Sequence, residues 1–105
     1  MKSRTYHILL ALADQDRHGQ AIAREVERLS EGELHLWPAA LYGSLDELVD
    51  CGWIAEADQP SEESERKRFY RLTKAGRGAL SVETDRLAGL VKVARARVRR
   101  AGETS

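Results

Sequence analysis

The chain has 105 residues, of which 42% are hydrophobic and 32% charged, a composition typical of one folded domain rather than a disordered segment. Its 17 lysines and arginines balance 17 aspartates and glutamates, which argues against a protein that binds polyanions over its whole surface. Cys51 is the single cysteine, which excludes a disulfide framework, and no apolar run reaches the roughly 20 residues of a membrane span, so we expect a cytoplasmic protein with no membrane association.

Two helices are predicted in the first third of the chain. The first covers residues 2–13, where the segment ILLALA indicates a helix that is buried on most sides. A polar break over residues 14–17 separates it from the second helix, which begins at residues 18–20 and ends at Gly32. The side chains expected to face the core are Ile8, Leu9 and Leu12 of the first helix and Ile22, Val26 and Leu29 of the second.

Three short strands are predicted in the middle of the chain. Residues 33–36 alternate polar and apolar side chains, and residues 53–57 and 67–72 form two further extended runs. The intervening DQPSEESE, residues 58–65, has the composition of a loop. The last two strands are therefore expected to form a β-hairpin with a long connection.

A third helix is predicted over residues 38–51, because Pro38 suits a first helical turn and Gly52 suits a C-cap. Its apolar stripe consists of Leu41, Leu45, Leu48 and Val49. Its outer face begins with Ala39 and Gly43, flanked by Ala40 and Tyr42, and continues with Asp46, Glu47 and Asp50. Two interpretations of the bare first half stay open: something large approaches closely there, or it packs against another helix. Trp37 and Trp53, at its ends, are interpreted as core or hinge residues.

The last helix is predicted to start after Thr73, a suitable N-cap, and to be long. Its single apolar stripe consists of Leu80, Thr84, Leu87, Val91, Ala94 and Val98, with Leu90 alongside. A small core cannot cover so long a stripe, so the same helix of a second chain is the simplest partner. Two rows of bases flank it: Lys92, Arg95 and Arg99, and Arg86, Arg97 and Arg100. We interpret them mainly as a solvated face, with phosphate contact by some of them as the alternative.

The sequence offers no catalytic motif. His7, His18 and His35 fall at no metal-ligand spacing, and no phosphate-binding glycine loop is present. We therefore expect no enzyme, no catalytic residue, no metal and no cofactor.

The order of the predicted elements is that of a winged helix-turn-helix with an appended helix, a mainly α fold with a small β-hairpin (α+β). In such a fold the third helix enters the major groove of DNA, and the wing, residues 58–68, lies along the backbone. Residues 1–73 are then expected to form the DNA-binding domain. Residues 74–105 are expected to form the C-terminal dimerisation helix and a short tail.

The runs HGQAIAREVE, LWPAALYGSLDELVDCGWI and RKRFYRLTKAGR together resemble the PadR family of bacterial transcriptional regulators, in its smaller subfamily with one helix after the wing. The resemblance implies homodimerisation through the C-terminal helix, repression at palindromic operators, a groove-facing Tyr42 and a basic wing at Arg66, Lys67 and Arg68. It also permits a small apolar or aromatic effector. The chain departs from the family at Gln20, where an aromatic residue is common, and in its acidic wing loop (Glu62, Glu63 and Glu65).

The function predicted from these features is that of a homodimeric, sequence-specific DNA-binding regulator that acts as a repressor at a double-stranded DNA operator. The alternative is a protein-interaction module that kept the fold and lost DNA binding. The predicted DNA-binding residues are Ala39, Ala40, Tyr42, Gly43, Ser44, Arg66, Lys67 and Arg68. The predicted dimerisation residues are Leu80, Leu87, Leu90, Val91, Ala94 and Val98.

Overall fold

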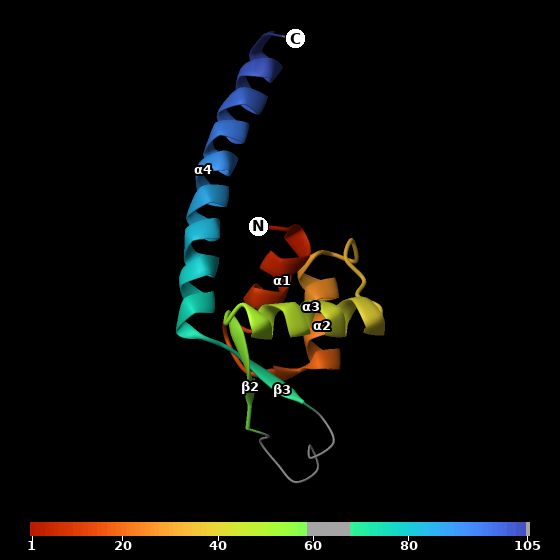
Figure 1. Cartoon of the computed structure of the whole chain (residues 1–105). Coiled ribbons are helices and arrows are strands. Elements are labelled where there is room, and N and C mark those ends of the chain that lie inside the picture. The colour runs from red at the N-terminus through yellow and green to blue at the C-terminus, as the bar shows by residue number, and fades with distance from the viewer. Residues whose placement is uncertain (59–67, 105) are drawn as a thin grey trace.

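The computed structural model describes residues 1–58 and 68–104, and within these ranges it confirms a mainly helical fold with a small antiparallel sheet (Figure 1). Three helices lie together above the sheet, and a long last helix rises away from them on one side. In chain order the elements are α1 (Ser3–Ala11), β1 (Arg17–His18), α2 (Gly19–Leu29), α3 (Pro38–Asp50), β2 (Ile54–Ala57), β3 (Phe69–Leu72) and α4 (Lys74–Thr104).

One core joins the first three helices to the sheet. The apolar stripes predicted for these helices supply most of it, since aliphatic side chains recurring at helical spacing share one face. Each fully buried aliphatic side chain contributes roughly 1.5–3 kcal/mol to folding. The largest side chains in the centre are Tyr70, Ile8, Leu9, Ile22, Leu45, Ile54 and Val26.

The sheet differs from the prediction in one of its three strands: β1 (Arg17–His18) takes part in it, and residues 33–36 do not. Its order is β1-β3-β2, with Arg17 opposite Tyr70 and Ile54 opposite Leu72, so β3 is paired on both sides. The strand predicted at residues 33–36 is wrong: this segment is a connection without strand pairing. Its alternation reflects burial alone, because Leu36 is buried and Leu34 packs against the core.

Arg17, which the sequence placed in a polar break, fixes β1 to its neighbours. Its Nε donates a hydrogen bond of 2.8 Å to the carbonyl oxygen of Ala11, and its Nη2 lies 3.2 Å from Oε2 of Glu25. The backbone of β1 also pairs with β3, with Arg17 opposite Tyr70. The segment between α1 and α2 is thus held against the sheet.

The turn that follows α3 is hydrogen-bonded to Thr73, the residue before α4. Thr73 donates its backbone N–H to the carbonyl of Trp53 (3.1 Å) and its hydroxyl to the carbonyl of Gly52 (2.6 Å). The same hydroxyl oxygen accepts the N–H of Gly76 (3.0 Å), which confirms Thr73 as the N-cap. At Gly76 a Cβ would lie 1.9 Å from the carbonyl oxygen of Trp53, so only glycine fits this junction.

Most of α4 projects beyond the body of the molecule. Its 31 residues span about 46 Å at 1.5 Å per residue. The radius of gyration is 16.6 Å, whereas a compact chain of this length has about 13 Å. The hydroxyls of Tyr6 in α1 and Thr84 in α4 lie 2.8 Å apart, so α4 is hydrogen-bonded to the body within its first half. Among the described residues, no helix is long and apolar enough to cross a membrane.

Candidate nucleic-acid interface

The outer face of α3 is bare over its first half. Ala39, Ala40 and Gly43 are exposed, whereas Leu41 and Leu45 on the opposite side are buried in the core. Trp37 provides no side-chain cap, and the backbone N–H groups of Ala39 and Ala40 belong to a first turn that has no intrahelical acceptors for them. A helix start of this kind favours a negatively charged group.

Ser44 does not belong to this exposed face. Its side chain is 8% exposed, because it follows Leu41 by three residues and precedes Leu48 by four, and so lies on the buried side of α3. The prediction that Ser44 contacts DNA is therefore corrected. The spacing itself could have revealed this, since positions three and four apart share one helical face.

Tyr42 is positioned by a glycine at the start of α2. A Cβ at Gly19 would lie 2.8 Å from the hydroxyl oxygen of Tyr42 and 2.9 Å from its Cε1. The ring therefore rests directly on the α2 backbone, with 42% of the residue exposed. Only the absence of a side chain at residue 19 allows Tyr42 to occupy this place.

Trp37 is exposed, so of the two interpretations, core or hinge residue, the structure contradicts the first. It is 70% exposed and touches the ring of His35 edge-on, with ring centroids 4.4 Å apart. Trp53 is half-buried and packs against the core, in agreement with the interpretation. The N-terminal end of α3 thus displays a large aromatic surface beside its small residues.

The wing is described only at its base. The predicted contacts Arg66 and Lys67 lie outside the described residues, whereas Arg68 is described and exposed. The Nε of Arg68 lies 3.7 Å from Oε1 of Glu56, and both side chains are largely exposed. Such a pair contributes little to stability, so Arg68 can exchange Glu56 for another anion at small cost.

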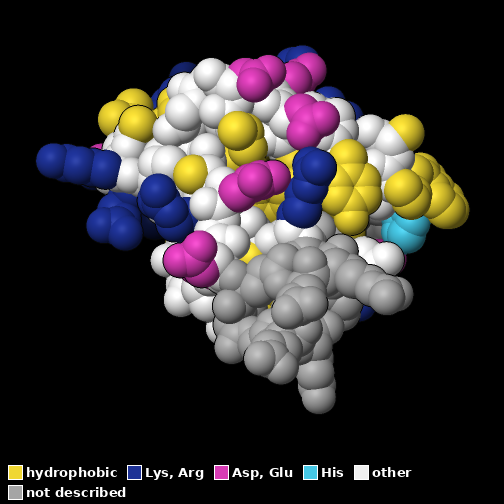
Figure 2. All heavy atoms as spheres, turned by 60° about the horizontal axis from the view of Figure 1, so that its bottom comes forward, with side chains coloured by type: hydrophobic (Ala, Val, Ile, Leu, Met, Phe, Trp, Pro, Cys, Tyr) yellow, Lys and Arg dark blue, Asp and Glu magenta, His cyan; other side chains and the backbone are white. Residues whose placement is uncertain are grey.

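The charges around α3 are mixed. Asp46, Glu47 and Asp50 are exposed on its second half. The face shown in Figure 2 carries acidic, basic and apolar side chains side by side, without one continuous basic surface on its visible part. On the visible, described part of this face, a polyanion would meet particular basic groups rather than a general positive field.

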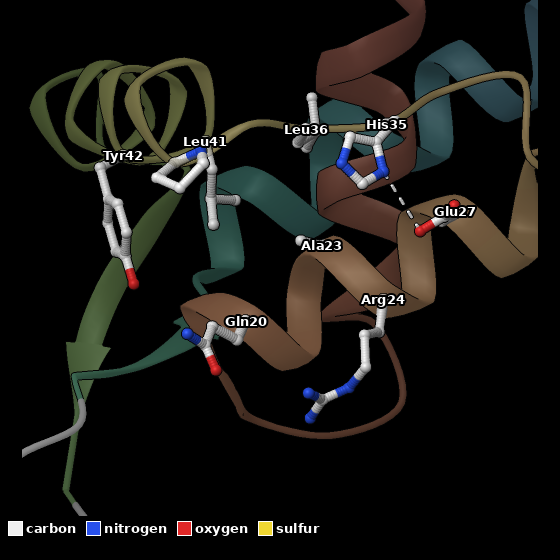
Figure 3. Close-up of a pocket in the computed structure, with 9 residues that line it drawn as sticks. Gln20, Ala23, Arg24, Glu27, His35, Leu36, Leu41 and Tyr42 are labelled. Carbon is white, nitrogen blue, oxygen red and sulfur yellow. Dashed lines mark ion pairs between the residues drawn. The ribbon is translucent and has the colours of Figure 1, made fainter.

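A groove of about 240 Å³ lies between α2 and the start of α3 (Figure 3). Gln20 and Arg24 extend from successive turns of α2, and Tyr42 reaches down from α3 toward the same end of the groove. Ala23 and Leu41 contribute to its apolar wall. The prediction of site residues missed Gln20 and Arg24, although their spacing of four places them on one face of α2.

The stripe of α4 divides into two parts. Leu80 is buried in the core of its own chain, so its assignment to a dimer contact is corrected. Leu87 is half-buried and Ala94 is exposed. The other three predicted contacts, Leu90, Val91 and Val98, are 56%, 48% and 72% exposed. The apolar surface beyond Leu80 is therefore largely uncovered by the chain itself.

Comparison with known proteins gives consistent matches. Residues 8–82 match the model of the family described as transcriptional regulator PadR-like. An uncharacterised 37.1 kDa protein in transposon TN4556 of Streptomyces fradiae is 41% identical over 83 residues; the match covers 79% of this chain but only 22% of that protein. Among solved structures, RosR of H. salinarum superposes with a TM-score of 0.69 at 29% identity, over 85% of this chain and 76% of that one.

A second solved structure supports the fold alone. A PadR family transcription regulator from Clostridium difficile superposes with a TM-score of 0.73 at 21% identity. The superposition covers 88% of this chain and 94% of that one, so it must include more than half of the 31 residues of α4.

Proposed function

The chain belongs to the PadR-like family of transcriptional regulators, and from this premise we propose that it is a homodimeric, sequence-specific DNA-binding repressor. Members of the family bind DNA and are regulators rather than enzymes. The observation that carries the proposal is the bare first half of α3, where Ala39, Ala40 and Gly43 are exposed beside Tyr42. Residues 1–73 would contact DNA and residues 74–105 would join the two chains.

In the proposed complex α3 lies in the major groove. The small side chains of Ala39, Ala40 and Gly43 let its backbone approach the base edges closely, and an alanine can contact a thymine methyl group. Tyr42 adds a hydroxyl at the edge of this surface. The wing lies along the neighbouring backbone, where Arg66, Lys67 and Arg68 would contact phosphates.

The sequence read by such a protein would depend strongly on DNA shape. The segment PAALYGSLDELVD that forms α3 contains no arginine, asparagine or glutamine, the side chains that make bidentate contacts with bases. Specificity would then come from the deformability of the site and from the distance between its two halves. A repressor of this kind blocks transcription by occupying its operator.

We test the proposal with a variant that removes Tyr42 and one that displaces it. Tyr42→Ala removes the phenol, and Gly19→Ala places a methyl group where the ring now rests, so both are expected to weaken binding about tenfold while the fold is kept. Fluorescence anisotropy would measure the affinity for the DNA upstream of the protein's own gene. Binding by the wild type should also weaken as salt rises.

Val49→Ala serves as the control, because Val49 lies at the far end of α3 and is 36% exposed. Its affinity should equal that of the wild type. Unchanged binding in both Tyr42→Ala and Gly19→Ala would refute the placement of α3, and failure of the wild type to retain any duplex from a random pool would refute the function.

A protein-interaction module is the second candidate, and the acidic second half of α3 favours it. Asp46, Glu47 and Asp50 would repel phosphates but suit a basic partner protein. Co-purification of one stoichiometric partner, together with no DNA retention at low salt, would select this alternative.

A further inference from the structure

We propose that the groove between α2 and α3 binds one sugar–phosphate unit of the DNA backbone, with Arg24 as the residue that contacts the phosphate. This inference rests on the proposed function. When the second helix of a helix-turn-helix enters the major groove, the helix before it crosses the backbone. In this chain that helix is α2, and the groove opens between it and α3.

Arg24 differs from two nearby arginines, Arg17 in β1 and Arg28 in α2, in having no hydrogen-bond or ion-pair partner among the described residues. Arg17 is held by the Ala11 carbonyl and by Glu25, and Arg28 donates two hydrogen bonds to the same Glu25 carboxylate. Arg24 is exposed and makes no hydrogen bond or ion pair within the part of the chain that the structure describes. Its guanidinium can therefore contact a phosphate without first breaking an internal ion pair.

The groove combines polar and apolar surface in the way a nucleotide backbone requires. Figure 3 shows Arg24 extending toward Gln20, at the end of the groove where Tyr42 descends from α3. The guanidinium, the amide and the phenol can each donate a hydrogen bond to a phosphate oxygen. The adjoining apolar wall, to which Ala23 and Leu41 contribute, suits the deoxyribose ring.

An acidic side chain at the other end limits where the phosphate can lie. Glu27 lines the groove two turns after Gln20, and its Oε2 lies 3.4 Å from Nδ1 of His35. Arg24 points away from Glu27 (Figure 3). The anion would therefore be held at the Gln20 end. The volume of about 240 Å³ is below the roughly 300–1,000 Å³ of sites for drug-sized ligands, which fits one backbone unit better than a larger effector.

The test measures the affinity of Arg24→Ala for two duplexes: one selected by the wild type from a random pool, and one of equal length with scrambled sequence. A lost phosphate contact should weaken both complexes by a similar factor of about ten. It should also reduce the slope of log affinity against log salt by about 0.9. Arg24→Lys should keep the slope, because it keeps the charge.

Arg28→Ala is the matched control, since Arg28 lies one turn later on α2 but is paired with Glu25. It should change both affinities less than about twofold. In a further arm, successive phosphates are replaced by uncharged methylphosphonates. One replacement should weaken binding by the wild type and leave Arg24→Ala unaffected.

The outcomes separate this inference from the function on which it rests. If Arg24→Ala behaves like Arg28→Ala, the groove does not bind the backbone, although DNA binding stands. A loss confined to the selected duplex would assign Arg24 to base recognition and also overturn the inference. If the wild type selects no duplex at all, the proposed function itself fails.

Discussion

Glu83 is a carboxylate at the contact between α4 and the body of the molecule. It is only 7% exposed, and the Arg86 guanidinium donates hydrogen bonds of 2.7 and 2.8 Å to its two oxygens. These hydrogen bonds, together with the positive charge of Arg86, lower the pKa of Glu83 from 4.5 to about 2. The folded state therefore favours the ionised carboxylate more strongly than the unfolded state does.

This shift predicts a pH-dependent contribution to stability. Because the pKa is lowered on folding, the contribution is complete above about 4.5 and is lost as the pH falls from there toward about 2. Glu83→Gln should lower the free energy of unfolding at pH 7, and its difference from the wild type should shrink across that window. Urea unfolding at several pH values measures it. The exposed neighbour gives the control Asp85→Asn, and a difference that stays constant with pH would contradict the assignment.

Two residues, Ser44 and Arg24, show what the sequence pattern does and does not reveal. Helical spacing predicts the buried side of α3 from its leucines, and Ser44, which was predicted to contact DNA, lies on that same side. Arg24 is not among the predicted DNA-binding residues, because a surface arginine has no pattern in the sequence that distinguishes it from other surface arginines. Within residues 1–58 and 68–104, Arg24 makes no ion pair, whereas Arg17 and Arg28 share Glu25, and only the folded structure reveals this difference.

At the scale of elements, the junction between the turn after α3 and the start of α4 depends on Gly76. Gly76→Ala would bring a methyl carbon to 1.9 Å from the Trp53 carbonyl oxygen, and a backbone atom cannot move aside as a flexible side chain can. We expect a loss of about 3 kcal/mol, at the upper end of the cost of overpacking. Thermal or urea unfolding of the purified variant would measure it.

Gly78→Ala is the matched control two residues later on the same helix. A Cβ there meets nothing within 4 Å, so alanine should stabilise α4 by about 0.5–1 kcal/mol through its lower backbone entropy cost. Equal effects of the two substitutions would mean that helix propensity, not the close contact, determines the result at Gly76.

The elements most accurately predicted are those with a repeating pattern. The helices α1 to α4 each have an apolar period or a cap signal, and the strands of the hairpin, β2 and β3, are rich in aromatic and apolar residues. The strand β1 has only two residues, Arg17 and His18, and exists because its backbone pairs with a strand far along the chain. Residues 33–36 show the converse, since their alternating pattern forms no strand when their backbone pairs with none of the three strands of the sheet.

At the scale of the whole molecule, α4 carries an uncovered apolar side. Val91 lies in the middle of the stripe that we propose as the dimer contact, and Val93 points to nearly the opposite side, because each residue turns the helix by about 100°. The two valines are similarly exposed, at 48% and 45%. They therefore provide a matched pair for testing the dimer.

Val91→Asp should place two carboxylates in the proposed contact and dissociate the dimer, raising its dissociation constant at least about a hundredfold. Val93→Asp should leave the dimer intact. Sedimentation equilibrium over a range of concentrations measures both. Equal behaviour of the two variants would exclude this side of α4 as the contact.

The bonded junction between the end of α3 and the start of α4 has a consequence for operator architecture. Thr73 joins α4 to the carbonyls of Gly52 and Trp53, so the direction of α4 and the direction of α3 are fixed relative to each other. In a dimer joined through α4, the crossing angle of the two long helices would then set the distance between the two copies of α3. The number of base pairs between operator half-sites would report that angle, and a ligand that changed the angle would alter which spacing the protein accepts.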